Sequence, residues 1–159
     1  MSARRPALRL RPLSASELTE FLPRLDDAYR RQLVELAGMP EYEAREKAAR
    51  DHASLFPGGR VADRHLALAA EDEGGRVVGQ IVYALRADGR AWLYWIEVDE
   101  SIRGRGYGRE TLRLFEEHAR AAGAHEAGLN VFAANAAARH LYRTSGWREQ
   151  SVWMGKPLA

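Results

Sequence analysis

Residues 98–108, Val-Asp-Glu-Ser-Ile-Arg-Gly-Arg-Gly-Tyr-Gly, contain three glycines that alternate with larger residues. Glycine at these positions lets several backbone N–H groups point into one concavity without side chains in the way. A helical pattern follows, and its positive end, together with nearby arginines, favours a bound anion. The stretch therefore predicts a pyrophosphate-binding loop, the alternative being a glycine-rich turn with solvated arginines. The residues expected to contact the anion are Arg103, Gly104, Arg105, Gly106, Tyr107, Gly108 and Arg109.

The spacing of these glycines argues against two common nucleotide-binding motifs. A dinucleotide fingerprint that begins at Gly104 requires a glycine at position 109, which is Arg109. A P-loop requires a lysine directly after its last glycine, and no lysine lies near this loop. Both motifs also belong to an opening β-α-β unit. An ordinary nucleotide-binding domain is therefore disfavoured.

The segments before the loop have the pattern of antiparallel strands. Strands are predicted at His65–Ala70, Val77–Leu85 and Ala91–Val98, because these short apolar runs are bounded by turn residues. The turns that join them are predicted at Glu73–Gly75 and Asp88–Gly89. Together they predict a meander of hairpins that leads directly into the glycine loop.

The remaining elements complete a mixed α+β domain over residues 1–159. A helix capped by Ser14 or Ser16 is predicted to reach Gly38, and Pro23 could kink or split it. The other predicted elements are a strand at Leu8–Arg11, a helix at Glu41–Leu55, a helix from the glycine loop to Gly123, a strand at Glu126–Phe132, a helix at Asn135–Thr144 and a strand or hairpin at Trp147–Met154. The fold class is therefore a mostly antiparallel sheet flanked by helices.

Composition excludes several classes of protein. The 159 residues are 46% hydrophobic and 29% charged, as in ordinary globular proteins. No stretch approaches the roughly 18 apolar residues that span a bilayer, and no secretory signal is evident, so a cytoplasmic protein without a membrane partner is expected. Cysteine is absent, which excludes disulfides and a thiolate nucleophile. The net charge of +2 does not favour nucleic acid, and the histidines lack metal-site spacing.

Two segments resemble motifs of the GNAT superfamily of N-acyltransferases. The glycine loop fits the acyl-CoA pattern [Q/R]-x-x-G-x-[G/A] with Arg103, Gly106 and Gly108. Residues 135–147, NAAARHLYRTSGW, resemble the family's segment N-x-x-A-x-x-L-Y-x-x-x-G-[F/Y/W]. The segments occur in the family's order, separated by one helix and one strand, and the resemblance covers roughly residues 8–156.

The resemblance implies where the acyl-CoA co-substrate binds. In the family, the strand before the loop splays from the strand equivalent to Glu126–Phe132. The pantetheine arm is expected in that gap, hydrogen-bonded to the backbone from Ile96 to Val98 like an added strand. Asn135 matches a position that contacts the pantetheine region. The pyrophosphate is expected on the backbone of residues 103–108.

Tyr142 is the predicted general acid. In the family, the matching tyrosine points at the CoA sulfur and protonates the departing thiolate. A phenol of pKa ~10 can donate to a thiolate whose conjugate acid has a pKa near ~8.5. The alternative is a tyrosine that only packs under the sheet.

Glu97 is the predicted general base for the attacking amine. In an unbroken strand Leu93, Trp95 and Glu97 share one face, which places the carboxylate among aromatic rings that raise its pKa. A bulge next to Val98 would change that face. The alternatives are a salt bridge to a neighbouring arginine, and a chain of water molecules as the base.

The expected activity is acetyl transfer from acetyl-CoA to a primary amine by direct attack in a ternary complex. No cysteine is present to hold the acyl group. The alternative is a non-catalytic acyl-CoA-binding sensor. The acceptor is expected to be a small-molecule or peptide amine, bound between Ser16–Leu55 and Trp147–Met154. No metal is expected, and a homodimer is a reasonable expectation for this class.

Overall fold

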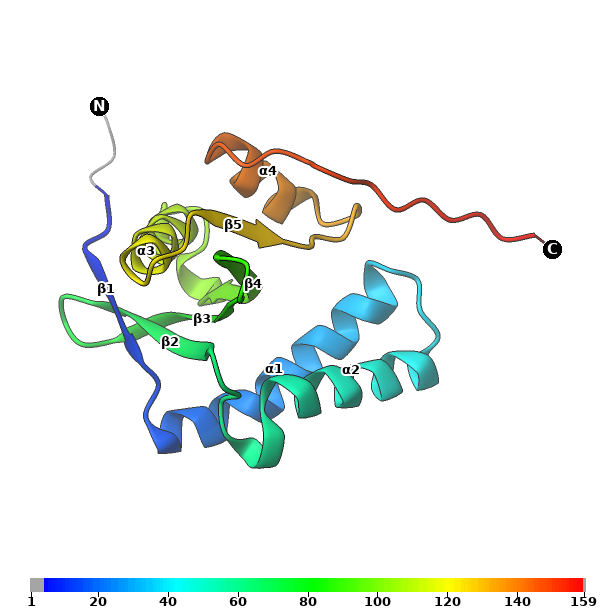
Figure 1. Cartoon of the computed structure of the whole chain (residues 1–159), viewed down its shortest axis with the longest axis horizontal. Coiled ribbons are helices and arrows are strands. Elements are labelled where there is room, and N and C mark those ends of the chain that lie inside the picture. The colour runs from blue at the N-terminus through cyan, green and yellow to red at the C-terminus, as the bar shows by residue number, and fades with distance from the viewer. Residues whose placement is uncertain (1–4, 159) are drawn as a thin grey trace.

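A five-stranded sheet forms the centre of the computed structural model, which describes residues 5–158 (Figure 1). Its strands lie in chain order, from β1 to β5. All neighbours are antiparallel except β4 and β5, which are parallel. The predicted meander is confirmed, because β2, β3 and β4 follow each other through two tight turns. The strands are β1 Leu8–Pro12, β2 His65–Asp72, β3 Val77–Leu85, β4 Arg90–Val98 and β5 Glu126–Leu129.

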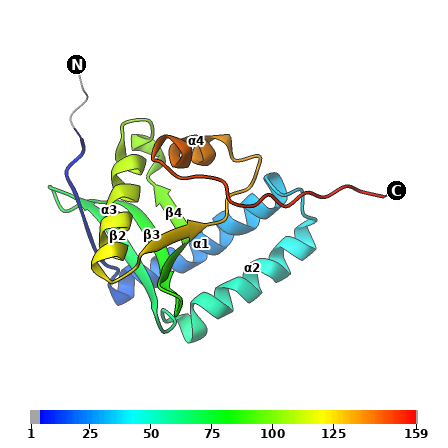
Figure 2. The same ribbon diagram turned by 45° about the horizontal axis from the view of Figure 1, so that its top comes forward.

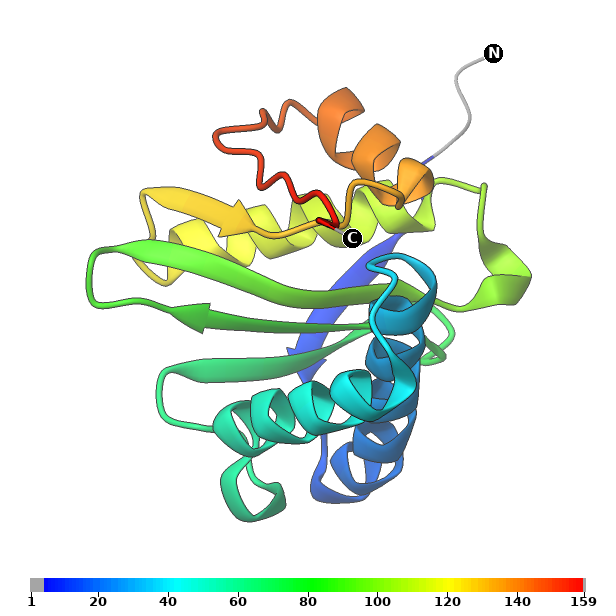
Figure 3. The same ribbon diagram turned by 90° about the vertical axis from the view of Figure 1, so that its right-hand side faces the viewer.

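Helices cover both faces of this sheet (Figure 3). Helix α1 packs against one face with α2 beside it, and α3 packs against the other face with α4 next to it. The helices are α1 Ala15–Glu35, α2 Glu41–Leu55, α3 Tyr107–Ala121 and α4 Ala136–Thr144, with single turns η1 Pro57–Gly59 and η2 Glu100–Ile102. The predicted α+β class is therefore confirmed.

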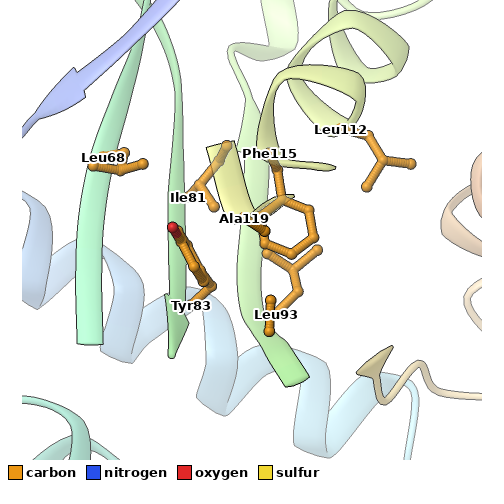
Figure 4. Packing of buried hydrophobic residues seen from close by; sticks show 8 residues of the cluster. Leu68, Ile81, Tyr83, Leu93, Leu112, Phe115 and Ala119 are labelled. Atoms are coloured by element: carbon orange, nitrogen blue, oxygen red, sulfur yellow. The ribbon is translucent and has the colours of Figure 1, made fainter. Parts of the chain in front are cut away.

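The larger part of the core lies between the sheet and α3 (Figure 4). Leu112, Phe115 and Ala119 recur at helical spacing on one side of α3. They pack against strand residues that point to this face, among them Ile81 and Tyr83. This packing fixes α3, and with it the glycine loop at its N-terminus, against the sheet.

Helix α1 is continuous through Pro23, so the predicted split does not occur. Its start is fixed by Ser14, whose side chain accepts a hydrogen bond from the Glu17 backbone at 3.2 Å while Glu17 accepts one from the Ser14 backbone at 2.8 Å. A proline inside a helix costs about 3 kcal/mol. Burial of an apolar side chain contributes about 1.5–3 kcal/mol. Phe21 and Leu22, buried directly before the proline, therefore offset its cost.

An ion network ties β1 to β2 and to the start of α1. The Arg11 side chain donates to Glu17 at 2.7 and 2.8 Å and to the buried Glu71 at 2.5 Å. Hydrogen bonding to Arg11 is the main reason that the pKa of Glu17 falls to about 2, and it also lowers the pKa of Glu71.

Acid should weaken this network. A carboxyl whose pKa is lowered by folding stabilises the protein above its ordinary pKa, and that stability is lost as pH falls through the folded value. The melting temperature should therefore fall between pH 5 and pH 2, and fall less in Arg11→Gln than in the parent chain. Thermal unfolding followed by circular dichroism across this range measures the difference. If the melting temperatures of the parent chain and of Arg11→Gln fell by the same amount over this pH range, the ion network would not be the cause of the acid sensitivity.

Two predicted strands differ in the structure. β5 ends at Leu129 instead of Phe132, because β4 offers it no partner beyond Leu93. Residues 147–154 form neither a strand nor a hairpin. From Arg148 onward the backbone makes no hydrogen bond to any other described residue, and Figure 1 shows this segment extending away from the body.

Candidate active site

An opening between β4 and β5 forms the centre of the candidate site. The two strands pair only from Arg90 and Glu126 to Leu93 and Leu129. Beyond Leu93, β4 continues beside β3 but has no partner on its other side among residues 5–158. The sheet is therefore splayed as the resemblance implies. The backbone from Ile96 to Val98 is exposed along the gap, where an extended chain could bind like an added strand.

A bulge at Tyr94 separates Leu93 from the face that Trp95 and Glu97 share. Trp95 lies opposite Val82, but Leu93 lies opposite the next residue, Tyr83, so Tyr94 is an extra residue in β4. Leu93 therefore points to the α3 face, while Trp95 packs with the α1 cluster. The prediction that Leu93, Trp95 and Glu97 share one face was wrong. Alternation from Trp95 places Glu97 on the α1 face.

The glycine loop presents a row of backbone donors. Gly104 and Gly106 have φ of 75° and 85°, and Gly106 is the N-cap of α3 without a side-chain cap. The six amide N–H groups of residues 104–109 donate to no acceptor within the described residues. A Cβ on Gly104 would meet no atom within 4 Å, so the concavity is open. This loop can therefore accept an anion with several oxygen atoms.

Arginines line a cavity of about 730 Å³ beside the loop. Arg105 lies at this cavity, as the sequence predicts, and makes no ion pair with any residue of the described range. Arg109 also lines it, but its guanidinium donates to the backbone oxygen and the hydroxyl of Thr144 at 2.8 and 2.7 Å. Arg103 does not line it: its side chain donates to the Val98 oxygen and to Glu100, both at 3.2 Å.

Two further arginines in this cavity were missed by sequence reasoning. Arg113 lies one helical turn after Arg109, so its spacing could have identified it. Arg5 is brought there because β1 passes close to α3, and no local pattern indicates that. Glu110 lies between them, and its hydrogen bond to Arg113 lowers its pKa.

Tyr142 lies at the opening on the α3 face. Helix α4 packs on the start of α3, where a Cβ on Gly108 would lie 3.6 Å from the Leu141 side chain. The Tyr142 ring lies 5.9 Å from that of Trp147, and packs against the same cluster as Ile96 of β4. Burial raises the pKa of Tyr142 to about 12. The phenol is protonated at neutral pH, as an ordinary tyrosine is, and its hydroxyl can donate one hydrogen bond.

Glu97 lies on the opposite face of the sheet from Tyr142. Its side chain is 24% exposed, and its Oε1 lies 4.0 Å from Nη1 of Arg24 on α1. This is a loose ion pair that leaves room for another partner. Trp95 lies on the same face, and its indole N–H is buried without an acceptor among the described residues.

Asn135 serves as the N-cap of α4. Its side-chain oxygen accepts a hydrogen bond from the Ala138 backbone at 3.1 Å. The residue thereby fixes where α4 begins beside the opening, and a contact with pantetheine stays a prediction. No cluster of potential metal ligands occurs among residues 5–158. Nor does any helix in that range have the length and apolar character to cross a bilayer.

Comparisons with known proteins agree with this geometry. The sequence profile of the Acetyltransferase (GNAT) family matches residues 22–147. The chain is 28% identical over 155 residues to YdgE of Bacillus subtilis (strain 168), which covers 96% of this chain and 99% of that protein. It is 26% identical over 152 residues to YycN of the same organism, covering 94% and 97%. Both relatives are named as N-acetyltransferases but are uncharacterised.

Solved structures show the same fold. The crystal structure of YycN matches with a TM-score of 0.89 at 25% identity, covering 96% of this chain and 99% of that one. Spermidine N-acetyltransferase from Vibrio cholerae, in complex with CoA and spermine, matches with a TM-score of 0.65 at 18% identity, covering 91% and 82%. Because the family profile spans most of the chain and the relatives match it nearly end to end, the chain belongs to the GNAT family and is an N-acetyltransferase enzyme.

Proposed function

We propose that this enzyme transfers an acetyl group from acetyl-CoA to a primary amine by direct attack in a ternary complex. The observation that carries the proposal is the row of six donor N–H groups at residues 104–109, next to the exposed backbone of β4. An elongated ligand with a pyrophosphate at one end and amide groups along its arm suits this combination of donors and open strand.

The residues present fit such a ligand. The backbone of residues 103–108 would hold the pyrophosphate, and Arg105 and Arg109 would add positive charge. The backbone from Ile96 to Val98 would pair with the pantetheine arm, and Asn135 lies at the start of α4 beside that path. Bound acetyl-CoA supplies a thioester, which is an activated acetyl group with a thiolate as its leaving group.

Tyr142 and Glu97 would hold the two protons that the reaction moves. The Tyr142 hydroxyl is protonated at neutral pH and would donate its proton to a thiolate in the opening. Burial raises its pKa to about 12 and so makes it a weaker acid, but the same burial would make the departing thiolate a stronger base. The Glu97 carboxylate lies on the α1 face, where an acceptor bound against α1 and α2 would present its amine. Deprotonation of a lysine-like amine of pKa ~10.4 costs about 4.6 kcal/mol at pH 7, so a nearby base would help the reaction.

Replacing Glu97 by glutamine should lower kcat/KM at least about tenfold at neutral pH. The loss should shrink as pH rises, because the free amine then becomes abundant without a base. Steady-state rates between pH 6.5 and pH 10 measure this. Arg24→Met is the matched control, since it removes the partner of Glu97 and leaves the carboxylate. A constant ratio of variant to parent rates across pH, or an equal effect of Arg24→Met, would remove Glu97 from the mechanism.

Release of free thiol from acetyl-CoA in the presence of an amine panel tests the proposed function itself. Mass spectrometry of the amines should show products 42 Da heavier, since acetylation adds about this mass to an acceptor. Binding of acetyl-CoA without thiol release in any mixture would favour the non-catalytic sensor.

A further inference from the structure

Helix α4, which carries Tyr142, is attached to the rest of the protein only at its surface. It has nine residues, and none of them is buried. Isolated helices shorter than about 12–15 residues are marginal in water, so the place of this helix depends on its contacts with other elements. Leu141 and Tyr142 pack against the core cluster between the sheet and α3. Contacts at the ends of α4 therefore contribute to where the Tyr142 hydroxyl lies.

The C-terminal end of α4 is bound by the side chain of Arg109. Its Nη1 donates to the backbone oxygen of Thr144, the last residue of α4, at 2.8 Å, and its Nη2 donates to the Thr144 hydroxyl at 2.7 Å. The last carbonyl groups of a helix lack partners within the helix and carry a partial negative charge, so a guanidinium is favourable there. Figure 2 shows this end of α4 beside the N-terminal end of α3, the end to which Arg109 belongs. Thr144 follows Tyr142 by two residues, so the contact fixes the turn of α4 that carries the phenol.

The chemistry of arginine matters for this contact. A planar guanidinium holds its donors in fixed directions, and here two of them reach two different acceptors of Thr144. A lysine would keep the charge but would place it on a compact, freely rotating ammonium. Glu110, the next residue in the chain, pairs with Arg113 instead of Arg109. The Arg109 side chain is therefore directed to α4 by geometry as well as by charge.

Arg109 also belongs to the glycine loop, because its backbone N–H is one of the six that donate to no acceptor within the described residues. We propose that Arg109 is a positioning residue, whose side chain holds α4 so that the Tyr142 hydroxyl lies where the thiolate of acetyl-CoA develops. The proposal goes beyond the anion contact expected from the sequence, and it rests on the proposed role of Tyr142 as the general acid. A displacement of about 1 Å can cost about 10²-fold in rate, so loss of this contact should slow the chemical step.

Arg109→Lys tests this role, because it keeps the charge and removes the fixed pair of donors. With an amine acceptor from the panel, the single-turnover rate should fall about tenfold or more, whereas the dissociation constant for acetyl-CoA in a calorimetric titration should change little. Thr144→Val removes the hydroxyl acceptor and leaves the backbone oxygen, so it should give a smaller loss of the same kind. Arg143→Lys is the matched control, since Arg143 also lies on α4 but donates to Glu149 at 2.5 Å, and its rate should equal that of the parent chain.

A double-mutant cycle with Tyr142→Phe separates positioning from a general loss of structure. If Arg109 acts through the Tyr142 hydroxyl, Arg109→Lys should slow the Tyr142→Phe variant much less than it slows the parent chain. An equal loss in both backgrounds would overturn the proposal, as would a weaker affinity for acetyl-CoA with an unchanged single-turnover rate. A slow Tyr142→Phe variant beside an unaffected Arg109→Lys variant would overturn this proposal alone. A Tyr142→Phe variant that reacts at the parent rate would overturn the general acid, and the positioning role with it.

Discussion

Tyr142→Phe should slow acetyl transfer by about 10²–10⁴-fold, the usual contribution of a single general acid. The substitution removes one hydroxyl and keeps the ring, which lies beside Trp147 and packs against the core cluster between the sheet and α3. The loss should appear in kcat, because a thiolate that needs a proton develops only in the transition state. It corresponds to about 2.7–5.4 kcal/mol of barrier at 1.36 kcal/mol per decade. Single-turnover rates should be compared, so that product release does not hide the chemical step.

Tyr83→Phe is the matched control for this experiment. Tyr83 belongs to the same core cluster, and burial raises its pKa to about 12 as well. Its hydroxyl, however, is hydrogen-bonded to Nδ1 of His118 at 2.7 Å, within the core packing of α3. Loss of that hydroxyl should lower stability and leave the single-turnover rate unchanged. If the Tyr142 variant also reacts at the parent rate while folded, the tyrosine only packs, and water or the acceptor must protonate the thiolate.

Gly106→Val should abolish most of the affinity for acetyl-CoA. Gly106 has φ of 85°, a conformation that costs a residue with a side chain roughly 1–2 kcal/mol. The chain can relieve this strain only by turning the peptide groups of the loop, which moves the N–H donors away from the anion. Each 1.4 kcal/mol is about a tenfold change in the dissociation constant. We therefore expect a loss of tenfold or more in a calorimetric titration, with a small decrease in melting temperature.

Gly123→Val is the matched control, because it introduces a similar backbone strain after the C-terminal end of α3, away from the loop. Gly123 has φ of 94°, close to the 85° of Gly106, and a Cβ built there meets no atom within 4 Å, whereas one on Gly106 would lie in ordinary contact with Pro6 at 3.7 Å. It should lower the melting temperature and leave acetyl-CoA affinity intact. A second comparison uses S-acetyl-pantetheine, which lacks the pyrophosphate. Equal weakening of both ligands by Gly106→Val, or unchanged affinity for acetyl-CoA, would show that the loop does not bind the pyrophosphate.

Local sequence patterns were sufficient to predict most of the helices and strands and the glycine loop. The meander, a serine helix cap at Ser14 or Ser16 and the glycines at 104 and 106 follow from residue types at short spacing, and the structure shows that Ser14 is the cap. Features that depend on contacts with residues distant in the sequence could not be predicted. The bulge at Tyr94 is visible only in the register with β3. The absence of a strand at residues 147–154 depends on whether a sheet edge is within reach, and the place of Arg5 depends on how β1 crosses α3.

The extra residue at Tyr94 also limits how this enzyme can change in length during evolution. Removal of Tyr94 itself would restore strict alternation and keep Leu93 opposite Tyr83 and Trp95 opposite Val82, so both faces of β4 would be preserved. A deletion at another position of β4 would move the residues between that position and Tyr94 to the other face of the sheet. An insertion in the turn at Glu73–Gly75 would disturb neither face, because that turn lies outside the paired register. When homologous sequences are aligned, gaps should therefore be permitted in that turn and at Tyr94, and penalised at the other positions between Arg90 and Val98.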